Sequence, residues 1–369
     1  MSRSSSGLYA EPYELQVKTY REHSFGSRTG ARPYAYTPTR VSELYVSVRE
    51  KVLPSRREAR VTTEVVPRGP YSLALSTRGA GDTCRRVSGG VLTTLLEIDG
   101  RIELAEAGQR SDGTVVLRAE SASGVEALRF QLALDDDHSA FLEHFARDPL
   151  LGRSTRALRG LRPIRLATIT HALLRALCGQ LITAREARAI EARVIHRVSQ
   201  RESETGLCAP PTQAQLAALA PAELCRLGLA ARRASALVRL CRMIDLERLR
   251  GLPLECVLAR LERERTIGPW SLGVLCLEGF GGYSYGLSGD LGLVKLCSVL
   301  EGRWVSEADT SELLARYGEW AGLASLYLLQ GSRRGLVPLG RGTTDVELAA
   351  RAVRSTSRSK TGATVALAE

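Results

Sequence analysis

The sequence predicts an α+β protein, in which a small antiparallel β-domain is followed by an all-α domain. Two patterns predict this order. Residues 71–134 alternate short β-like runs with glycine-containing turns, which is typical of an antiparallel sheet. From residue 135 to about residue 330, hydrophobic residues recur at the three- and four-residue spacing of amphipathic helices. A chain of 369 residues is long enough for about two or three domains.

The β-domain is assigned to residues 61–134. Its β-like runs are residues 71–76, 91–98, 114–119 and 128–134. The pairs Asp99-Gly100 and Asp112-Gly113 separate neighbouring runs. Both pairs favour tight hairpin turns, because aspartate and glycine tolerate the positive φ that such turns require. Consecutive runs are therefore expected to pair antiparallel.

The helical domain is assigned to residues 135–331. Its stripes comprise Ile169, Leu173, Ala176 and Leu177; Ala187, Ile190, Val194 and Val198; Leu237, Leu240, Cys241 and Ile244; and Val257, Leu258 and Leu261. Pro221 is expected in the first turn of a short helix, where a missing N–H costs nothing. A break at residues 265–270 separates the last stripe from another helix.

Basic charge is concentrated at the two ends of the chain. The sequence has 51 Lys+Arg against 40 Asp+Glu, a net charge of +11, which suits a polyanionic partner. Residues 1–60 carry 11 basic and 6 acidic side chains, and residues 332–369 carry 7 and 3. We interpret residues 1–60 as a basic, flexible arm and residues 332–369 as a basic, disordered tail. The body of the protein would then bind nucleic acid through a local patch.

Several classes of protein and site are disfavoured. No apolar run approaches the roughly 20 residues of a membrane span, and the first residues lack the apolar core of a secretory signal. We therefore expect a cytoplasmic protein without a membrane partner. The eight cysteines form no C-x-x-C pair, and the five histidines do not cluster with other metal ligands. We expect no metal site.

The break between the helices has a composition suited to DNA. Gly268 permits a tight turn, and Pro269 suits the first position of the next helix. A hairpin of this kind presents backbone N–H groups to a phosphate without reading a base. Asp290 follows in Ser-Gly-Asp-Leu-Gly-Leu, at the expected start of a further helix. An aspartate there is most often simply an N-cap, which is the alternative to a catalytic role.

Four segments together resemble the helix-hairpin-helix DNA glycosylases, specifically the 3-methyladenine DNA glycosylase II branch. They are Leu161-Arg-Pro with the following helix that ends in Gly-Gln-Leu-Ile-Thr, the hairpin Thr266-Ile-Gly-Pro-Trp, the Gly-Asp-x-Gly-Leu element with Asp290, and Trp320-Ala-Gly-Leu-Ala-Ser. Their joint order and spacing over residues 135–331 are specific, although each segment alone is weak. The upstream sheet matches the β-domain of this branch in pattern.

The resemblance implies a DNA-3-methyladenine glycosylase, an N-glycosyl hydrolase of base excision repair. Asp290 matches the catalytic aspartate, and Trp270 stands where strand-cleaving relatives carry a Schiff-base lysine, so a monofunctional hydrolase is expected. Trp270 and Trp320 match aromatic residues of the base pocket, and Leu181 matches the wedge that fills the DNA stack. The alternative for all three is ordinary core packing.

The resemblance also implies the partner and the hairpin contacts. The partner is double-stranded DNA with a damaged base, bound by a monomer near the nucleoid. Thr266, Gly268 and Pro269 would meet the DNA backbone, and carbonyls around Thr266 and Gly268 are the candidates for a monovalent cation; no other cofactor is implied. Tyr283 and Tyr285 precede Asp290 and are further candidates for the pocket.

One departure from the family pattern bears on activity. Thr266 replaces the first glycine of the usual Gly-hydrophobic-Gly. A threonine forced to positive φ is strained by roughly 1–3 kcal/mol, or the turn is altered. Thr266 therefore keeps open the alternative of a DNA-binding protein that retains the fold without activity. The other alternative is a glycosylase for an oxidised or deaminated base, which the shape of the pocket decides.

Overall fold

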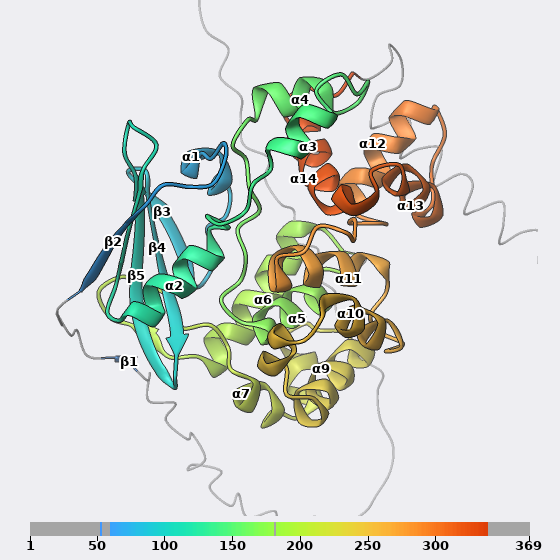
Figure 1. Cartoon of the computed structure of the whole chain (residues 1–369). Coiled ribbons are helices and arrows are strands. Elements are labelled where there is room, and N and C mark those ends of the chain that lie inside the picture. Colours follow the sequence, from blue (N-terminus) through green and yellow to red (C-terminus); the bar gives the residue numbers. More distant parts are fainter. Residues whose placement is uncertain (1–51, 54–59, 181, 339–369) are drawn as a thin grey trace, which may run out of the picture. The chain divides into compact units, whose positions relative to one another are not determined.

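The computed structural model describes residues 52–53, 60–180 and 182–338 (Figure 1). Most of the predicted arm (residues 1–60) and of the predicted tail (residues 332–369) lies outside the described residues. The described part contains an antiparallel sheet and a larger set of helices, so the predicted α+β class is confirmed.

The main sheet has five antiparallel strands. Their order across the sheet is β2 (Val61–Val65), β6 (Val115–Ala119), β5 (Arg101–Gln109), β4 (Val91–Ile98) and β3 (Arg85–Ser88). Ile98 pairs with Arg101, and the connecting Asp99 and Gly100 both have positive φ, as the sequence predicted for a tight hairpin. A separate parallel pair joins β1 (Val52–Leu53) to β7 (Arg201–Glu202).

Two predicted β-like runs are helical, which corrects the sequence interpretation. Residues 73–76 form α1 (Leu73–Ser76), and much of the run 128–134 lies in α2 (Ala122–Gln131). Each helix begins at a serine whose side chain accepts a backbone N–H, Ser72 from Leu75 and Ser121 from Gly124. The buried residues of α2 pack on the sheet, so Leu128 is buried from a helix and not from a strand.

The remaining helices follow the sheet in the chain. They are α3 (Ser139–His144), α4 (Gly152–Ala157), α5 (Ile169–Cys178), α6 (Ala184–Val198), α7 (Gln213–Ala217), α8 (Pro221–Arg226), α9 (Ala231–Met243), the 3₁₀-helix η1 (Glu247–Gly251), α10 (Leu254–Glu262), α11 (Pro269–Val274), the π-helix η2 (Leu275–Phe280), α12 (Leu291–Glu301), α13 (Glu307–Ala315), the 3₁₀-helix η3 (Gly318–Trp320) and α14 (Ala321–Ser332). Pro221 and Pro269 both stand at helix starts, as predicted.

Three hydrophobic clusters hold these elements together. One lies between the sheet and α2, and a second surrounds α5, which is buried along its whole length. The third joins α3 and α4 to α12, α13 and α14, where the buried Tyr327 donates to the carbonyls of Leu158 and Leu161. The start of α5 is satisfied by Glu247, whose carboxylate accepts the backbone N–H groups of Ile169 and Thr170.

A buried ion-pair network connects the sheet to the helices. Arg175, near the end of α5, donates from Nη2 to Asp82 Oδ2 at 2.7 Å and to Glu191 Oε1 at 2.9 Å. Its Nη1 donates to Glu278 Oε2 at 2.9 Å. Asp82 lies just before β3, Glu191 on α6 and Glu278 in η2, so one guanidinium joins four parts of the chain.

The acids of this network are held in their charged form. Burial alone would raise the pKa of Glu191, but Arg175 and the His171 ring, 2.7 Å away, outweigh it and lower the pKa to about 2. Burial likewise opposes ionisation of Asp82, and the guanidinium groups of Arg85 and Arg175 hold its pKa well below the usual value. The network is therefore a folded-state stabiliser that depends on ionised acids.

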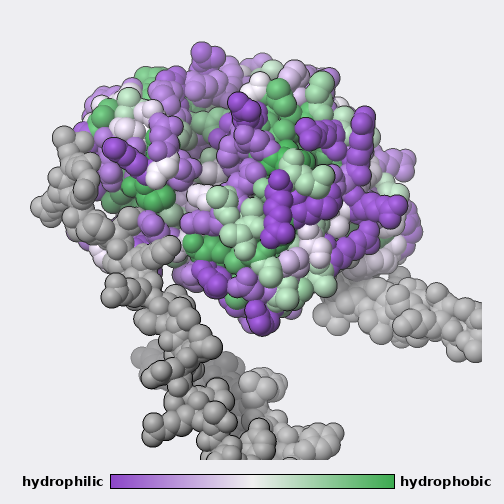
Figure 2. All heavy atoms as spheres, turned by 90° about the horizontal axis from the view of Figure 1, so that it is seen from below, coloured by the Kyte–Doolittle hydropathy of each residue, from purple (hydrophilic) through white to green (hydrophobic). Residues whose placement is uncertain are grey.

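The exposed surface carries scattered hydrophobic residues. Figure 2 shows one face, on which separate hydrophobic areas lie among hydrophilic side chains. The large exposed hydrophobics of the described chain include Val66, Met243 and Leu252. No helix within the described ranges is both long and apolar enough to cross a membrane.

Arg175→Met is expected to lower the free energy of unfolding by about 3–5 kcal/mol, because it leaves buried carboxylates without their main partner. The measurement is urea denaturation at pH 7. Arg248→Met is the matched control, since Arg248 forms an exposed pair with Asp245 at 3.6 Å. It should cost less than about 1 kcal/mol. Equal small losses in the two variants would contradict the role assigned to Arg175.

Glu191→Gln tests the pH dependence of the same network. The folded-state pKa of Glu191 lies below its ordinary value of 4.5, so its charge stabilises the fold above that pH and ceases to do so as the pH falls toward about 2. The stability difference between wild type and variant should be largest above pH 4.5 and shrink below it. Urea midpoints measured from pH 7 to pH 3 give this difference, and a pH-independent difference would refute the depressed pKa.

Candidate active site

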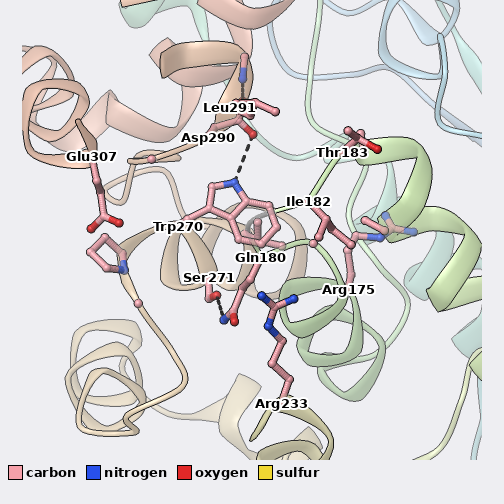
Figure 3. Close-up of a pocket in the computed structure, with 18 of the residues that line it drawn as sticks. Arg175, Gln180, Ile182, Thr183, Arg233, Trp270, Ser271, Asp290, Leu291 and Glu307 are labelled. Atoms are coloured by element: carbon pink, nitrogen blue, oxygen red, sulfur yellow. Dashed lines mark hydrogen bonds between the residues drawn. The ribbon is translucent and has the colours of Figure 1, made fainter. Parts of the chain in front are cut away.

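A cavity of about 1010 Å³ lies where α5, α6, α11 and α12 meet (Figure 3). Five residues singled out from the sequence line it: Thr266, Gly268, Pro269, Trp270 and Asp290. They come from the α10–α11 hairpin and the start of α12, which are separated by the π-helix η2 and a glycine-rich loop. The structure therefore brings the predicted hairpin and the predicted carboxylate into one site.

Asp290 is both the N-cap of α12 and part of the cavity wall. Its Oδ1 accepts the backbone N–H groups of Gly292 at 2.8 Å and Leu293 at 3.3 Å. Its Oδ2 accepts the indole Nε1–H of Trp270 at 3.2 Å (Figure 3). The N-cap explanation and the catalytic explanation are thus compatible, because one oxygen anchors the carboxylate and the other lies at the cavity.

The Trp270 indole is held between Asp290 and the end of α5. Gly179 is the C-cap of α5, and a Cβ on it would come within 2.3 Å of the indole Cη2. Any side chain at this position would have to displace the ring. Gly179 is therefore a position where the absence of a side chain determines the shape of the site.

The hairpin does not need the conformational freedom of glycine. Gly268 has φ −91° and ψ −179°, and the only described non-glycine residues with positive φ are Asp99 and Ala133. Thr266 is thus free of the backbone strain considered from the sequence. Gln180, at the end of the α5 segment, donates from Nε2 to the Thr266 carbonyl at 2.6 Å and to Ser271 Oγ at 2.8 Å.

Trp320 does not belong to this cavity, which corrects the sequence prediction. It lies in η3 and packs against the rings of Phe141, Phe145 and His144, with centroid separations of 6.4, 5.7 and 5.5 Å. The core explanation weighed for Trp320 therefore accounts for its position. Leu181, the predicted wedge, lies outside the described residues, although its neighbours Gln180 and Ile182 line the cavity.

The two tyrosines before Asp290 also lie away from the cavity. Tyr283 is half-buried. Its hydroxyl donates a hydrogen bond to Asp136 and accepts one from Arg165. Burial raises the pKa of Tyr283 above its usual value. Tyr285 packs against the cluster around α5. Neither side chain lines the cavity.

Positive charge predominates around the cavity. The basic lining residues are Arg175, Arg188, Arg232, Arg233, Arg265, Lys295 and Arg333, and the acidic ones are Glu191, Glu278, Asp290 and Glu307. Arg175, Glu191 and Glu278 neutralise one another in the buried network. Five of these cations form no ion pair with any described residue and remain available to a polyanion: Arg232, Arg233, Arg265, Lys295 and Arg333.

The sequence did not identify every residue that shapes the site. The sequence alone is compatible with two roles for Gln180, a contact with DNA or a cap on the helix end, and it singles out neither Gly179 nor Arg233. Arg233 points toward the cavity from the first turn of α9 (Figure 3). The sequence feature nearest to these contacts is the pair Gly179-Gln180 at a helix end. The pair does not predict the contacts, because the hydrogen-bond partners of Gln180 lie more than 80 residues away in the sequence.

The comparisons with known proteins come from solved structures, because no sequence-family model and no curated relative matches this chain. A 3-methyladenine DNA glycosylase from Archaeoglobus fulgidus is 20% identical, with a TM-score of 0.65 and coverage of 74% of this chain and 98% of that one. MBOgg1 in complex with a low-affinity DNA ligand is 14% identical, with a TM-score of 0.61 and coverage of 76% and 98%.

A third similar structure also contains DNA. It is an 8-oxoguanine glycosylase/lyase from Clostridium acetobutylicum in complex with DNA containing cytosine opposite 8-oxoguanine. It is 16% identical, with a TM-score of 0.59 and coverage of 75% of this chain and 99% of that one. The three matches span nearly all of the compared chains but do not single out one branch. This chain therefore shares the fold of these solved DNA glycosylases.

Proposed function

We propose that this protein is a monofunctional DNA glycosylase that hydrolyses the N-glycosidic bond of alkylated purines, of the 3-methyladenine type, in base excision repair. The observation that carries the proposal is the Asp290 carboxylate, anchored by one oxygen and placed at a large cavity by the other. The fold shared with solved glycosylases supports the same class of reaction.

Asp290 can supply what this reaction needs. Cleavage of the bond leaves positive charge on the sugar, and a fixed carboxylate beside the sugar stabilises that charge and orients water. The hydrogen bonds to Oδ1 hold the group in place before DNA arrives, so little reorganisation accompanies the reaction. An alkylated purine is already cationic and leaves without a strong general acid.

Trp270 bears on the base and on the fate of the DNA strand. Its indole lines the cavity next to Asp290, and a ring face attracts a cationic base. An indole cannot form an imine with the sugar, so the hairpin supplies no nucleophile for strand cleavage. These two properties together favour a hydrolase for alkylated purines over a glycosylase/lyase.

The proposed partner is double-stranded DNA that contains a damaged base, bound by a monomer in the cytoplasm at the nucleoid. The unpaired cations at the cavity, Arg233 and Lys295 among them, would meet phosphates. Gly268 and Pro269 at the start of α11 would present backbone to the same strand, and the wedge role of Leu181 stays part of this proposal. Extrusion of the base costs a few kcal/mol, less for a damaged pair.

The proposal assigns no step to a cofactor. The carbonyls around Thr266 and Gly268 stay the candidates for a monovalent cation. The Thr266 carbonyl accepts a hydrogen bond from the Gln180 amide, and the Gly268 carbonyl accepts one from the Leu272 backbone N–H at 3.0 Å. Each carbonyl oxygen keeps a second lone pair that a cation could use.

A second candidate is a glycosylase for an oxidised base. Two of the similar solved structures favour it, since one is described as an 8-oxoguanine enzyme and the other as an Ogg1. The alternative of a non-catalytic DNA-binding protein rested on backbone strain at Thr266. This argument is removed, because Thr266 does not have a positive φ. Base release from a panel of lesions separates the three possibilities.

Asp290→Asn is expected to lower the single-turnover rate of base release by a factor on the order of 10² to 10³. Asparagine caps a helix as well as aspartate, so the variant should stay folded. The substrates are duplexes with 3-methyladenine, 8-oxoguanine or hypoxanthine, and the assay is chromatography of the free base. Asp309→Asn is the matched control, because Asp309 also accepts a backbone N–H at a helix start but lies outside the cavity. Equal rates for wild type and Asp290→Asn would exclude the proposed carboxylate.

Strand cleavage is the second test of the mechanism. After base release, the DNA should break only on treatment with alkali, because Trp270 offers no amine. Gel electrophoresis with and without alkali measures this. Borohydride, which traps an imine between enzyme and sugar, should give no covalent complex. A trapped complex would show that a lysine forms a Schiff base and that the enzyme is bifunctional.

A further inference from the structure

The turn between α5 and α6 contacts the hairpin through two successive residues, Gly179 and Gln180. Gln180 Nε2 donates to the carbonyl of Thr266 and to Ser271 Oγ, at 2.6 and 2.8 Å. One acceptor precedes the Gly268–Pro269 turn and the other follows it in α11. A single side-chain amide therefore spans the hairpin, and Figure 3 shows its contact with Ser271 beside the indole.

These contacts are made where water has little access. Ser271 is only 1% exposed, and its hydroxyl oxygen accepts from Gln180. Ile267, between Thr266 and Gly268, is 4% exposed and anchors the hairpin in the core around α5. Loss of the Gln180 amide would leave a buried hydroxyl and a carbonyl without this donor. The hairpin would then be free to shift relative to α5.

The Trp270 indole connects the turn between α5 and α6 to the Asp290 carboxylate. The ring lies so close to Gly179 that a Cβ there would be 2.3 Å from Cη2, and its Nε1–H reaches Asp290 Oδ2 at 3.2 Å. The residues on both sides of Trp270 in the hairpin, Thr266 and Ser271, are those that Gln180 holds. A movement of the hairpin would therefore move the donor that orients the Oδ2 of Asp290.

We propose that Gln180 is a positioning residue for the Asp290 carboxylate, acting through the hairpin and the Trp270 indole. The inference rests on the catalytic role proposed for Asp290. The hydrogen bonds of Gln180 go to Thr266 and Ser271 and not to Asp290, so its effect is on where the carboxylate and the indole lie. A displacement of about 1 Å near a reacting centre costs up to about 100-fold in rate.

Two simpler roles would leave different signatures. If Gln180 only fastened the fold, its loss would lower stability and leave the rate of the bound complex unchanged. If it only contacted DNA, its loss would weaken DNA binding and again leave that rate unchanged. A positioning residue lowers the rate at saturating enzyme while affinity for DNA is kept.

The experiment compares Gln180→Leu with Gln213→Leu in the full chain. Gln213 is a matched control, because its Nε2 also donates two hydrogen bonds. The acceptors are the backbone carbonyls of Cys241 at 2.8 Å and Ile244 at 2.7 Å. It lies in α7, away from the cavity. The single-turnover rate at saturating enzyme and the Kd for a duplex with a stable abasic-site analogue are measured, with thermal unfolding alongside.

Gln180→Leu should lower the single-turnover rate about 10- to 100-fold and change the Kd by less than about threefold. Gln213→Leu should lower the melting temperature and leave rate and Kd unchanged. If Gln180→Leu does not fold, Ser271→Ala takes its place in the experiment. It removes one of the two acceptors of Gln180 and should give a smaller loss of rate. An unchanged rate, or a loss confined to Kd, would overturn the proposal.

A second readout does not depend on base release. The sequence has three tryptophans, so Trp270 is the sole indole in a Trp304→Phe/Trp320→Phe background. Gln180→Leu in that background should increase acrylamide quenching of Trp270, and Gln213→Leu should not. Quenching unchanged by Gln180→Leu would overturn the positioning role. A wild type that releases no base from any substrate would overturn only the proposed function, because the quenching result stands by itself.

Discussion

The structure depends most on the burial of one positive charge. Arg175 lies at the end of α5, beneath the cavity, where a guanidinium without partners would be very unfavourable. The fold resolves this by bringing three carboxylates to it, from the loop before β3, from α6 and from η2. The sheet, α6 and the π-helix are thereby fixed relative to α5. Gly179 is the C-cap of α5, and Gln180 follows it. The ion pairs of Arg175 therefore also fix the two residues against which the hairpin and the Trp270 indole pack.

The candidate site uses ordinary elements of helical structure for a chemical purpose. A carboxylate that caps α12 is anchored by two backbone N–H groups, and this leaves its second oxygen for the cavity. The indole that donates to this oxygen is kept in place by a glycine on one side and by the hairpin on the other. Such a site is ready before the substrate binds. In the proposed reaction, such a fixed carboxylate would stabilise the short-lived positive charge on the sugar.

Local patterns in the sequence predicted much of the fold, and the resemblance to a known family predicted the central part of the site. The hairpin at Asp99-Gly100 and the proline starts of α8 and α11 followed from turn chemistry. The joint placement of Trp270 with Asp290 followed from the resemblance. The alternation in residues 128–134 was misleading, because Ser121 caps a helix and Leu128 is buried against a sheet that a local pattern does not contain. Trp320 was misplaced for a related reason. Whether an aromatic residue faces a cavity or the rings of α3 depends on tertiary packing.

The π-helix η2 keeps two cavity residues on one side of a helical segment. Trp270 and Glu278 both line the cavity, eight residues apart on one continuous helical segment. On a regular α-helix, eight residues advance by two turns and roughly 80° more, so the two side chains would diverge. The wider π-turn reduces that rotation. Deleting one residue between Trp270 and Glu278 would leave them seven residues apart, which on a regular α-helix is within roughly 20° of two full turns. Glu278 would then keep its side of the helix, because the π-turn acts as a single residue inserted into an α-helix. Homologous sequences should therefore differ in this segment by one residue far more readily than by two.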